Sequence, residues 1–98
     1  MNFPAIPEKY RLDIEKATSL LKEEGCSEIF LFGSLVTGKY TATSDIDLGV
    51  TGLPPRKYIR TCSKLSNILE SEFDLVDFDE NEKLYKLLHS IGEIVKVG

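Results

Sequence analysis

Residues 29–50 have the sequence IFLFGSLVTGKYTATSDIDLGV, in which two short apolar runs are joined by a polar segment. The first run ends at Gly33-Ser34, and the second contains two aspartates, Asp45 and Asp47, with one residue between them. Ten residues separate Ser34 from Asp45. No other part of the sequence combines a turn suited to a phosphate with paired carboxylates, so any chemistry of this chain is expected here.

The two apolar runs predict two strands. Residues 29–32 are too few and too uniformly apolar for a surface helix, which favours a strand buried on both faces. Residues 34–38 have room for about one helical turn, and residues 39–44 form a polar loop. From Asp45 to Thr51, apolar residues alternate with others, which predicts a strand with one apolar face and one face carrying both carboxylates.

Helical patterns flank this segment. A first helix begins at Glu8 and ends before Gly25, which fits the left-handed residue after a helix end. After a break at residues 52–55, residues 56–72 predict a second amphipathic helix. Its buried stripe is expected to consist of Tyr58, Cys62, Leu65 and Leu69, widened by Ile59 and Ile68.

The remaining chain predicts a strand, a helix and a strand. Residues 73–78 are short and apolar, as in a third strand. Asp79 and Glu80 then suit the start of a third helix, where acidic groups complement free backbone N–H groups. Gly92 ends this helix, and residues 93–97 form a short terminal strand. The buried stripe of the helix is expected to consist of Leu84, Leu87, Leu88 and Ile91.

This order of elements predicts an α/β (α+β) domain with a small mixed β-sheet and helices packed on it. The chain has 98 residues, which is close to the commonest domain size, so we expect residues 1–98 to form a single domain.

Composition restricts the partners. The formal net charge of −4 argues against long nucleic acid, which normally needs a basic surface, but a small anionic substrate carried with a metal ion remains compatible. No apolar run approaches the roughly 20 residues of a membrane span. The N-terminal sequence lacks the features of a signal peptide, and Cys26 and Cys62 have no metal-ligand spacing, so we expect a cytoplasmic protein with reduced thiols.

Asp45 and Asp47 suit a metal site. Residues two apart on a strand share a face, with Cα atoms roughly 6.5–7 Å apart. Two carboxylates so placed repel each other, and a divalent ion such as Mg²⁺, which prefers oxygen ligands, removes that repulsion. A solitary Asp-x-Asp motif is more commonly an exposed strand face with two incidental acids.

Gly33-Ser34 suits a phosphate. A glycine after a buried strand lets the backbone turn tightly and approach a ligand closely. The serine hydroxyl and the nearby N–H groups suit phosphate oxygens. Alone, this dipeptide would be interpreted as a helix cap. Beside the two aspartates, it could hold the phosphates of a ligand whose metal ion the aspartates bind.

A two-metal transfer site needs a further carboxylate, to bind the metal next to the attacking hydroxyl. Asp74 and Asp77 both lie in the third predicted strand. Since they have opposite parity, they cannot face the same side. Periodicity alone leaves the choice between them open.

The segment GSLVTGKYTATSDIDLGV resembles the signature of the DNA polymerase beta-like nucleotidyltransferase superfamily, and the whole chain most resembles its minimal nucleotidyltransferases of bacteria and archaea. The resemblance implies the nucleotidyltransferase fold and transfer of a nucleoside monophosphate, AMP from ATP, to an acceptor hydroxyl. It implies that Asp45 and Asp47 bind two Mg²⁺ ions and that Asp74, rather than Asp77, completes one of them. Gly33 and Ser34 would then hold the β- and γ-phosphates.

The resemblance also implies a partner, because several minimal members are similar to antitoxins that add AMP to a tyrosine of a HEPN-domain toxin. One departure matters. Relatives often carry an arginine after Gly-Ser, where this chain has Leu35-Val36-Thr37, and the nearest cation is Lys39. The alternative is therefore a binding module that neutralises a HEPN-type partner by complex formation without chemistry. Transfer to a small molecule such as an aminoglycoside is disfavoured, because those enzymes usually add a second domain or a dimer.

Overall fold

The computed structural model describes residues 6–98, so the first five residues of the N-terminal sequence interpreted above lie outside it. Helices and strands follow one another in the predicted order. None of the helices in the described range is both long and apolar enough to cross a membrane. In chain order, the elements are α1 (Glu8–Glu23), β1 (Glu28–Phe32), α2 (Ser34–Thr37), β2 (Ile46–Thr51), the 3-10 turn η1 (Pro55–Lys57), α3 (Tyr58–Ile68), β3 (Phe73–Asp77), α4 (Glu82–Ile91) and β4 (Ile94–Lys96).

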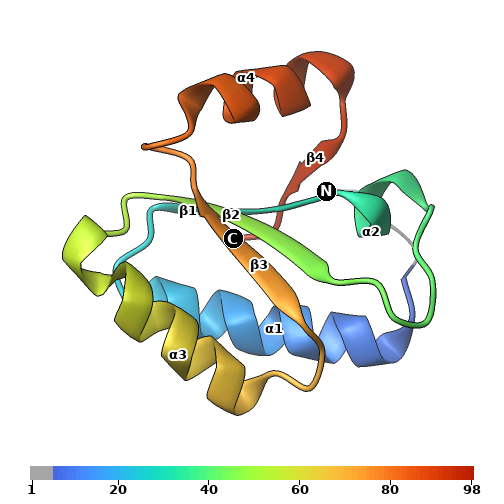
Figure 1. Cartoon of the computed structure of the whole chain (residues 1–98), viewed down its shortest axis with the longest axis horizontal. Helices are drawn as coiled ribbons and strands as arrows, with labels where there is room; N and C mark the ends of the chain where they lie inside the picture. Colours follow the sequence, from blue (N-terminus) through green and yellow to red (C-terminus); the bar gives the residue numbers. More distant parts are fainter. Residues whose placement is uncertain (1–5) are drawn as a thin grey trace.

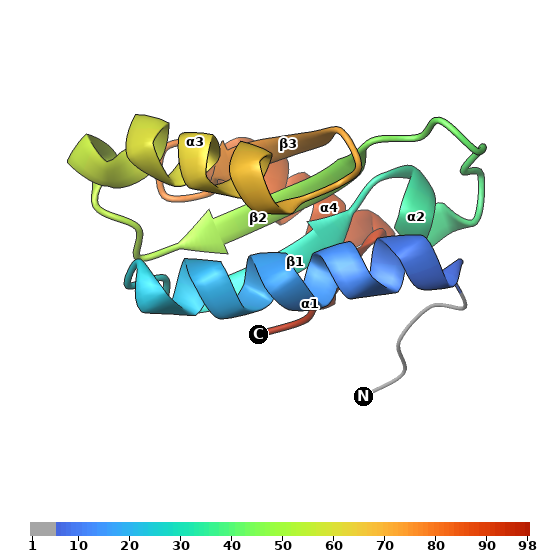
Figure 2. The ribbon, with the colours of Figure 1, turned by 90° about the horizontal axis from the view of Figure 1, so that it is seen from below.

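The four strands form one sheet in the order β3-β2-β1-β4. Strand β1 runs antiparallel to β2 and β4, whereas β2 and β3 are parallel. The predicted mixed sheet is therefore confirmed. Helices α1 and α3 lie side by side on one face, and α4 lies on the other (Figure 1, Figure 2). Strand β3 forms one edge of the sheet.

Both faces of β1 are buried, as its uniform apolarity predicted. Ile29 and Leu31 join the larger core under α1 and α3, and Phe30 joins the aromatic cluster under α4. The predicted apolar face of β2 is buried through Ile46, Leu48 and Val50, and part of the other face, which carries Asp47, is covered as well. Phe78 covers Gly49 so closely that a Cβ at this glycine would lie 2.0 Å from the Cε2 atom of the ring.

The predicted second helix is four residues too long. It ends at Ile68, and Leu69 is extended, with φ −89° and ψ 141°. Asp13, buried in α1, accepts the backbone N–H groups of Glu70 and Ser71 at 3.2 and 2.9 Å. These groups are satisfied by a carboxylate rather than by a further helical turn, so the chain leaves the helix and turns into β3.

The predicted buried stripes are also too wide. In α3, Ile59 is 80% exposed and Ile68 39% exposed. In α4, only Leu88 is buried, while Leu87 and Ile91 are about half exposed. The reason is that α4 contacts the sheet through one row of side chains, which packs against Phe30 and Phe78.

The start of α4 also differs from the prediction. The helix begins at Glu82, with Asn81 as its N-cap, and not at Asp79 or Glu80. The Asp79 carboxylate instead accepts the N–H of Gly52 at 2.7 Å. It therefore ties the loop after β2 to the loop after β3.

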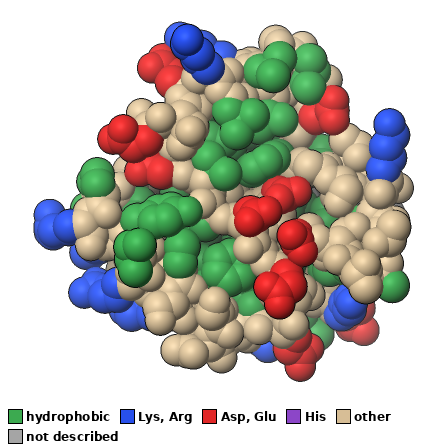
Figure 3. Space-filling model, in the orientation of Figure 1, with side chains coloured by type: hydrophobic (Ala, Val, Ile, Leu, Met, Phe, Trp, Pro, Cys, Tyr) green, Lys and Arg blue, Asp and Glu red, His purple; other side chains and the backbone are tan. Residues whose placement is uncertain are grey.

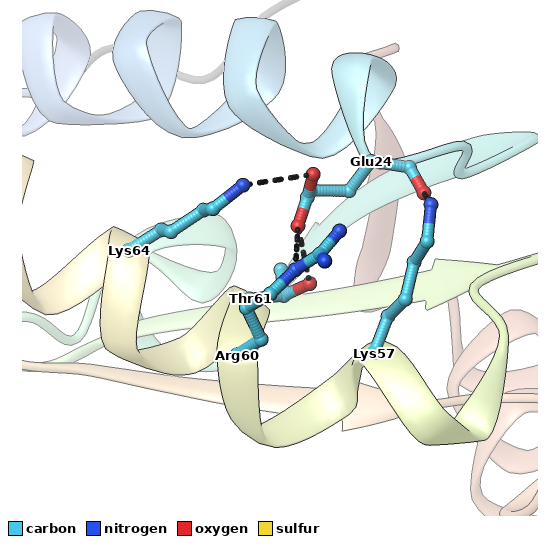
Figure 4. A network of polar contacts seen from close by, with 5 residues as sticks. All are labelled: Glu24, Lys57, Arg60, Thr61 and Lys64. Carbon is cyan, nitrogen blue, oxygen red and sulfur yellow. Dashed lines mark hydrogen bonds and ion pairs between the residues drawn. The ribbon is translucent and has the colours of Figure 1, made fainter.

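Glu24 joins α1 to α3 through a partly buried polar network (Figure 4). Its side chain is only 6% exposed and accepts hydrogen bonds from Thr61 Oγ1 at 3.2 Å and Lys64 Nζ at 3.3 Å. Arg60 Nε lies 3.4 Å from the same carboxylate. Lys57 Nζ donates to the Glu24 carbonyl at 3.3 Å. The network fixes the distance between the helices that cover this face of the sheet.

This network should make stability depend on pH. Burial by itself raises the pKa of Glu24, but the hydrogen bond and charge of Lys64, with Arg60 and Thr61, lower that pKa below its ordinary value of 4.5. A lowered pKa in the folded state adds stability above the unfolded pKa, and this stability is lost as pH falls through the folded value. We therefore expect Glu24→Gln to be less stable than the wild type at pH 7, with a difference that shrinks below about pH 4.5.

Urea unfolding of both proteins between pH 3 and pH 8 measures this difference. The matched control is Glu82→Gln, which breaks an exposed ion pair with Lys86 of 2.9 Å and should change stability by less than about 1 kcal/mol. A stability loss in Glu24→Gln that is the same at pH 3 and pH 7 would contradict the role given to its charge.

Candidate active site

Strand pairing brings Asp47 and Asp74 together. The two residues are direct partners in the parallel pairing of β2 and β3, and residues directly opposite each other point to the same side of a sheet. Asp77 is instead the partner of Val50, on the other side. It is 8% exposed and accepts the N–H of Asp79 at 2.9 Å. The opposite orientation of the two candidate acids is therefore confirmed, and Asp74 is the one beside Asp47.

Asp45 lies one residue before β2, at the end of the loop, rather than within the strand as predicted. Asp45 is exposed, yet its negative charge contributes to the raised pKa of Asp47. Burial, the negative charges of Asp74 and Asp45, and a hydrogen bond with the Asp74 carboxyl raise the pKa of Asp47 to about 6. In the orientation of Figure 1, the surface facing the viewer carries acidic side chains near its middle, next to an apolar area (Figure 3). The site is a centre of concentrated negative charge.

Gly33 closes the site from the β1 side. Its φ of 77° and ψ of −151° lie in a region that is essentially restricted to glycine. A Cβ on Gly33 would lie 2.1 Å from Asp47 Oδ2, so the Asp47 carboxylate occupies the space that a side chain would need. Helix α2 starts immediately afterwards, with the N–H groups of Val36 and Thr37 bonded to the Gly33 carbonyl at 3.0 and 3.1 Å. Ser34 and Leu35 lie between Gly33 and these two donors in the chain, so their backbone N–H groups are at the start of the helix.

A cleft of about 480 Å³ lies beside the two paired carboxylates. The sequence motifs did not reveal most of the residues that line it, because the lining comes from five separate elements, β1, β2, α3, β3 and α4. Phe32, for example, is opposite Asp47 in the antiparallel pairing, which becomes evident only when the strand register is known. Besides Asp47 and Asp74, the cleft is lined by Phe32, Tyr58, Cys62, Phe73, Leu75, Val76 and Leu84.

The donor set suits a hard cation. All three candidate ligands are carboxylates, which Mg²⁺ prefers. The pKa of Asp47 is raised first by burial and then by the negative charges of Asp74 and Asp45, and a bound cation would relieve that repulsion. Within residues 6–98, no three His, Cys, Asp or Glu side chains are gathered closely enough to form a metal site. The close pair of oxygen donors is Asp47 and Asp74, whose chemistry fits Mg²⁺, and Asp45 is an exposed carboxylate outside this pair.

This small mixed sheet, with its Gly-Ser turn and facing carboxylates, has the architecture of a nucleotidyltransferase domain. The chain belongs to the family described as "Polymerase beta, Nucleotidyltransferase", whose model matches residues 15–96. The predicted fold class is thereby confirmed.

Solved structures that resemble this chain agree with the family assignment. A toxin–antitoxin crystallised with AMP-PNP is 33% identical, with a TM-score of 0.57 over 66% of this chain and 56% of that one. A mutant of the toxin–antitoxin MntA-HpeT is 27% identical, with a TM-score of 0.67 over 87% of this chain and 71% of that one. The chain thus spans less than two thirds of the length of the first of these relatives. The comparison with curated proteins gave no match. The resemblance to a minimal nucleotidyltransferase is confirmed.

Proposed function

We propose that this chain is a Mg²⁺-dependent nucleotidyltransferase that moves AMP from ATP to an acceptor hydroxyl of a partner protein, a HEPN-type toxin for which it is the antitoxin. The observation that carries the proposal is the pairing of Asp47 with Asp74 across β2 and β3, beside Asp45 and the Gly33 turn. The likeness to a toxin–antitoxin crystallised with AMP-PNP supports the nucleotide and the kind of partner. A cytoplasmic location belongs to the same proposal.

Each residue has a defined task in this reaction. Asp45, Asp47 and Asp74 would hold two Mg²⁺ ions, which when bound neutralise phosphate charge and make the acceptor hydroxyl more acidic. Gly33 and Ser34 bind the β- and γ-phosphates through backbone N–H groups and the serine hydroxyl. The acceptor oxygen forms a bond to the α-phosphorus, the bond to pyrophosphate breaks, and Asp74 accepts the hydroxyl proton. Asp74 suits this task because it is exposed at the edge of the cleft.

The cleft favours a protein acceptor. The side chains of Phe32, Tyr58 and Leu84 give it an apolar and aromatic lining next to the carboxylates. Such a surface suits a tyrosine side chain, whose ring can pack while its hydroxyl reaches the charged end. A strongly polar acceptor such as an aminoglycoside would instead need more hydrogen-bonding groups than these residues offer.

The direct test is transfer of label. The chain is incubated with α-labelled ATP, Mg²⁺ and the protein encoded by the adjacent gene, and we expect the label on that protein. The double variant Asp45→Asn/Asp47→Asn should abolish labelling. Labelling that is unchanged in the double variant would refute the assignment.

A pair of variants distinguishes the roles of Asp74 and Asp77. We expect Asp74→Asn to slow labelling about 10²-fold, the lower end for loss of a positioned proton acceptor. Asp77→Asn should lower the melting temperature, because Asp77 is buried and accepts the Asp79 N–H group, but should keep its rate per folded molecule. Labelling rates corrected for the folded fraction decide the matter, and the reverse pattern would make Asp77 the third carboxylate.

A binding module is the second candidate, and two observations favour it. Leu87 and Ile91, one turn apart on α4, are 54% and 51% exposed, and residues 35–37 carry no cation. If binding alone neutralises the partner, Leu87→Lys/Ile91→Lys should abolish neutralisation, whereas Asp45→Asn/Asp47→Asn should not. Neutralisation that requires the aspartates would instead support the enzyme.

A further inference from the structure

We propose that the hydroxyl group of Tyr10 positions Asp45, and through it the exposed carboxylate of the metal site. Tyr10 lies in the first turn of α1, far from the motif in sequence, and its side chain is 1% exposed. Its Oη lies 3.0 Å from the carbonyl oxygen of Ser44, and 3.2 and 3.3 Å from those of Thr41 and Ala42. The loop before Asp45 is thus wrapped around one buried hydroxyl. The inference rests on the proposed function, because it concerns a ligand of that site.

The bond to Ser44 acts directly on Asp45. The Ser44 carbonyl and the Asp45 N–H belong to one planar peptide unit, so a hydrogen bond that holds the oxygen also fixes the orientation in which the chain enters Asp45. On the other side of Asp45, the N–H of Ile46 donates to the Glu72 carbonyl at 3.0 Å. Asp45 lies between these two anchors and outside the β2 ladder.

Little else holds this loop. Among the described residues, hydrogen bonds from residues 40–45 to the rest of the chain involve only Tyr10 and Lys9. Lys9 Nζ donates to the Ala42 carbonyl at 3.1 Å, but this contact is exposed and does not adjoin Asp45. The other bonds stay inside the loop, such as Thr41 N–H to Ser44 Oγ at 2.7 Å. The buried anchor next to Asp45 is therefore Tyr10.

Phenylalanine at position 10 isolates the hydroxyl from the ring. The ring belongs to the core and meets the Tyr40 ring edge-on, with centroids 6.4 Å apart, and Phe keeps this packing. Tyr40 supplies a matched control, because its hydroxyl makes no hydrogen bond within residues 6–98. Tyr40→Phe therefore removes the same atom from the neighbouring ring without removing an anchor.

The test compares the full chain with Tyr10→Phe and Tyr40→Phe. Hydrogen exchange is measured at the amides of residues 41–46, and Mn²⁺ affinity by titration calorimetry. In Tyr10→Phe, we expect exchange of these amides to accelerate and Mn²⁺ to bind about tenfold more weakly, as after loss of a group that orients a ligand. The melting temperature should fall by only a few degrees. In the labelling reaction, more Mg²⁺ should be needed for half the maximal rate, and saturating Mg²⁺ should restore most of that rate.

Tyr40→Phe should match the wild type in all of these measurements. The inference is overturned if Tyr10→Phe matches Tyr40→Phe in both loop exchange and Mn²⁺ affinity. If the wild-type chain binds no Mn²⁺ and labels no acceptor, the proposed function fails. The exchange comparison still decides in that case whether Tyr10 anchors the peptide unit before Asp45.

Discussion

Gly33→Ala should reduce nucleotidyl transfer by about 10³-fold, the upper end for removal of one preorganised electrostatic group. The added Cβ would lie 2.1 Å from Asp47 Oδ2 and 3.0 Å from Asp47 Cγ. The end of a flexible side chain can swing away from such a clash, so the protein should still fold. Asp47 would then leave its position beside Asp74, and the metal half of the site would be lost.

The backbone conformation at Gly33 adds a separate loss of stability, which a control variant can account for. At φ 77° and ψ −151°, an alanine should lose about 1–3 kcal/mol of stability. Gly38 ends the same short helix at φ 82° and ψ 5°, and a Cβ added there would meet nothing within 4 Å. Gly38→Ala should therefore lose about 1–2 kcal/mol through its left-handed backbone but keep its activity. Labelling rates and melting temperatures of both variants are measured together, and a fully active Gly33→Ala would refute the close approach of Asp47.

Gly49→Ala should have the largest effect on stability, a loss of about 3 kcal/mol, the upper end for overpacking a core. The Cβ would lie 2.0 Å from Phe78 Cε2 and 2.2 Å from Cζ. Phe78 is 2% exposed, and three other aromatic rings surround it. The centroids of the Phe30, Phe32 and Tyr85 rings lie 5.9, 5.7 and 5.2 Å from its own. These three rings restrict how far the Phe78 ring can turn away from the new methyl group.

Chemical denaturation measures this loss, and a second substitution tests its cause. In the Gly49→Ala background, Phe78→Leu removes the ring that the new methyl group strikes. The double variant should therefore lose less stability than the sum of the two single variants. Gly92→Ala is the control, because Gly92 has φ 71° and nothing within 4 Å of an added Cβ, so only backbone strain is tested there. Additive losses in the double variant would show that Phe78 is not the cause.

Local patterns were sufficient for the elements and for the motif. The order of helices and strands, the turn at Gly33-Ser34 and the opposite parity of Asp74 and Asp77 all follow from residues close together in the chain. These features depend on backbone preferences and on periods of two or about 3.6 residues, which act over a few residues. For the same reason, the burial of both faces of residues 29–32 could be predicted.

The predictions from the sequence were wrong where residues distant in the chain determine the local structure. The end of α3 depends on Asp13, whose carboxylate binds N–H groups 57 and 58 residues away. Whether Leu87 and Ile91 are buried depends on how closely α4 approaches the sheet, because their spacing fits a buried stripe equally well. Glu24 looks like any acid at the end of a surface helix, yet Thr61 and Lys64 enclose it.

The sequence by itself predicted the segment of residues 29–50 as the candidate site, because a turn and two acids at this spacing are local properties of the chain. Its periodicity also narrowed the candidates for the third carboxylate to two residues, Asp74 and Asp77. Only the tertiary structure decided that Asp74 lies beside Asp47, since strand register depends on the pairing of β2 with β3. It also brought Tyr10 to the loop before Asp45, a contact that joins residues 34 positions apart. The physical reason is that hydrogen bonds and side-chain packing act between neighbours in space, which only the folded chain defines.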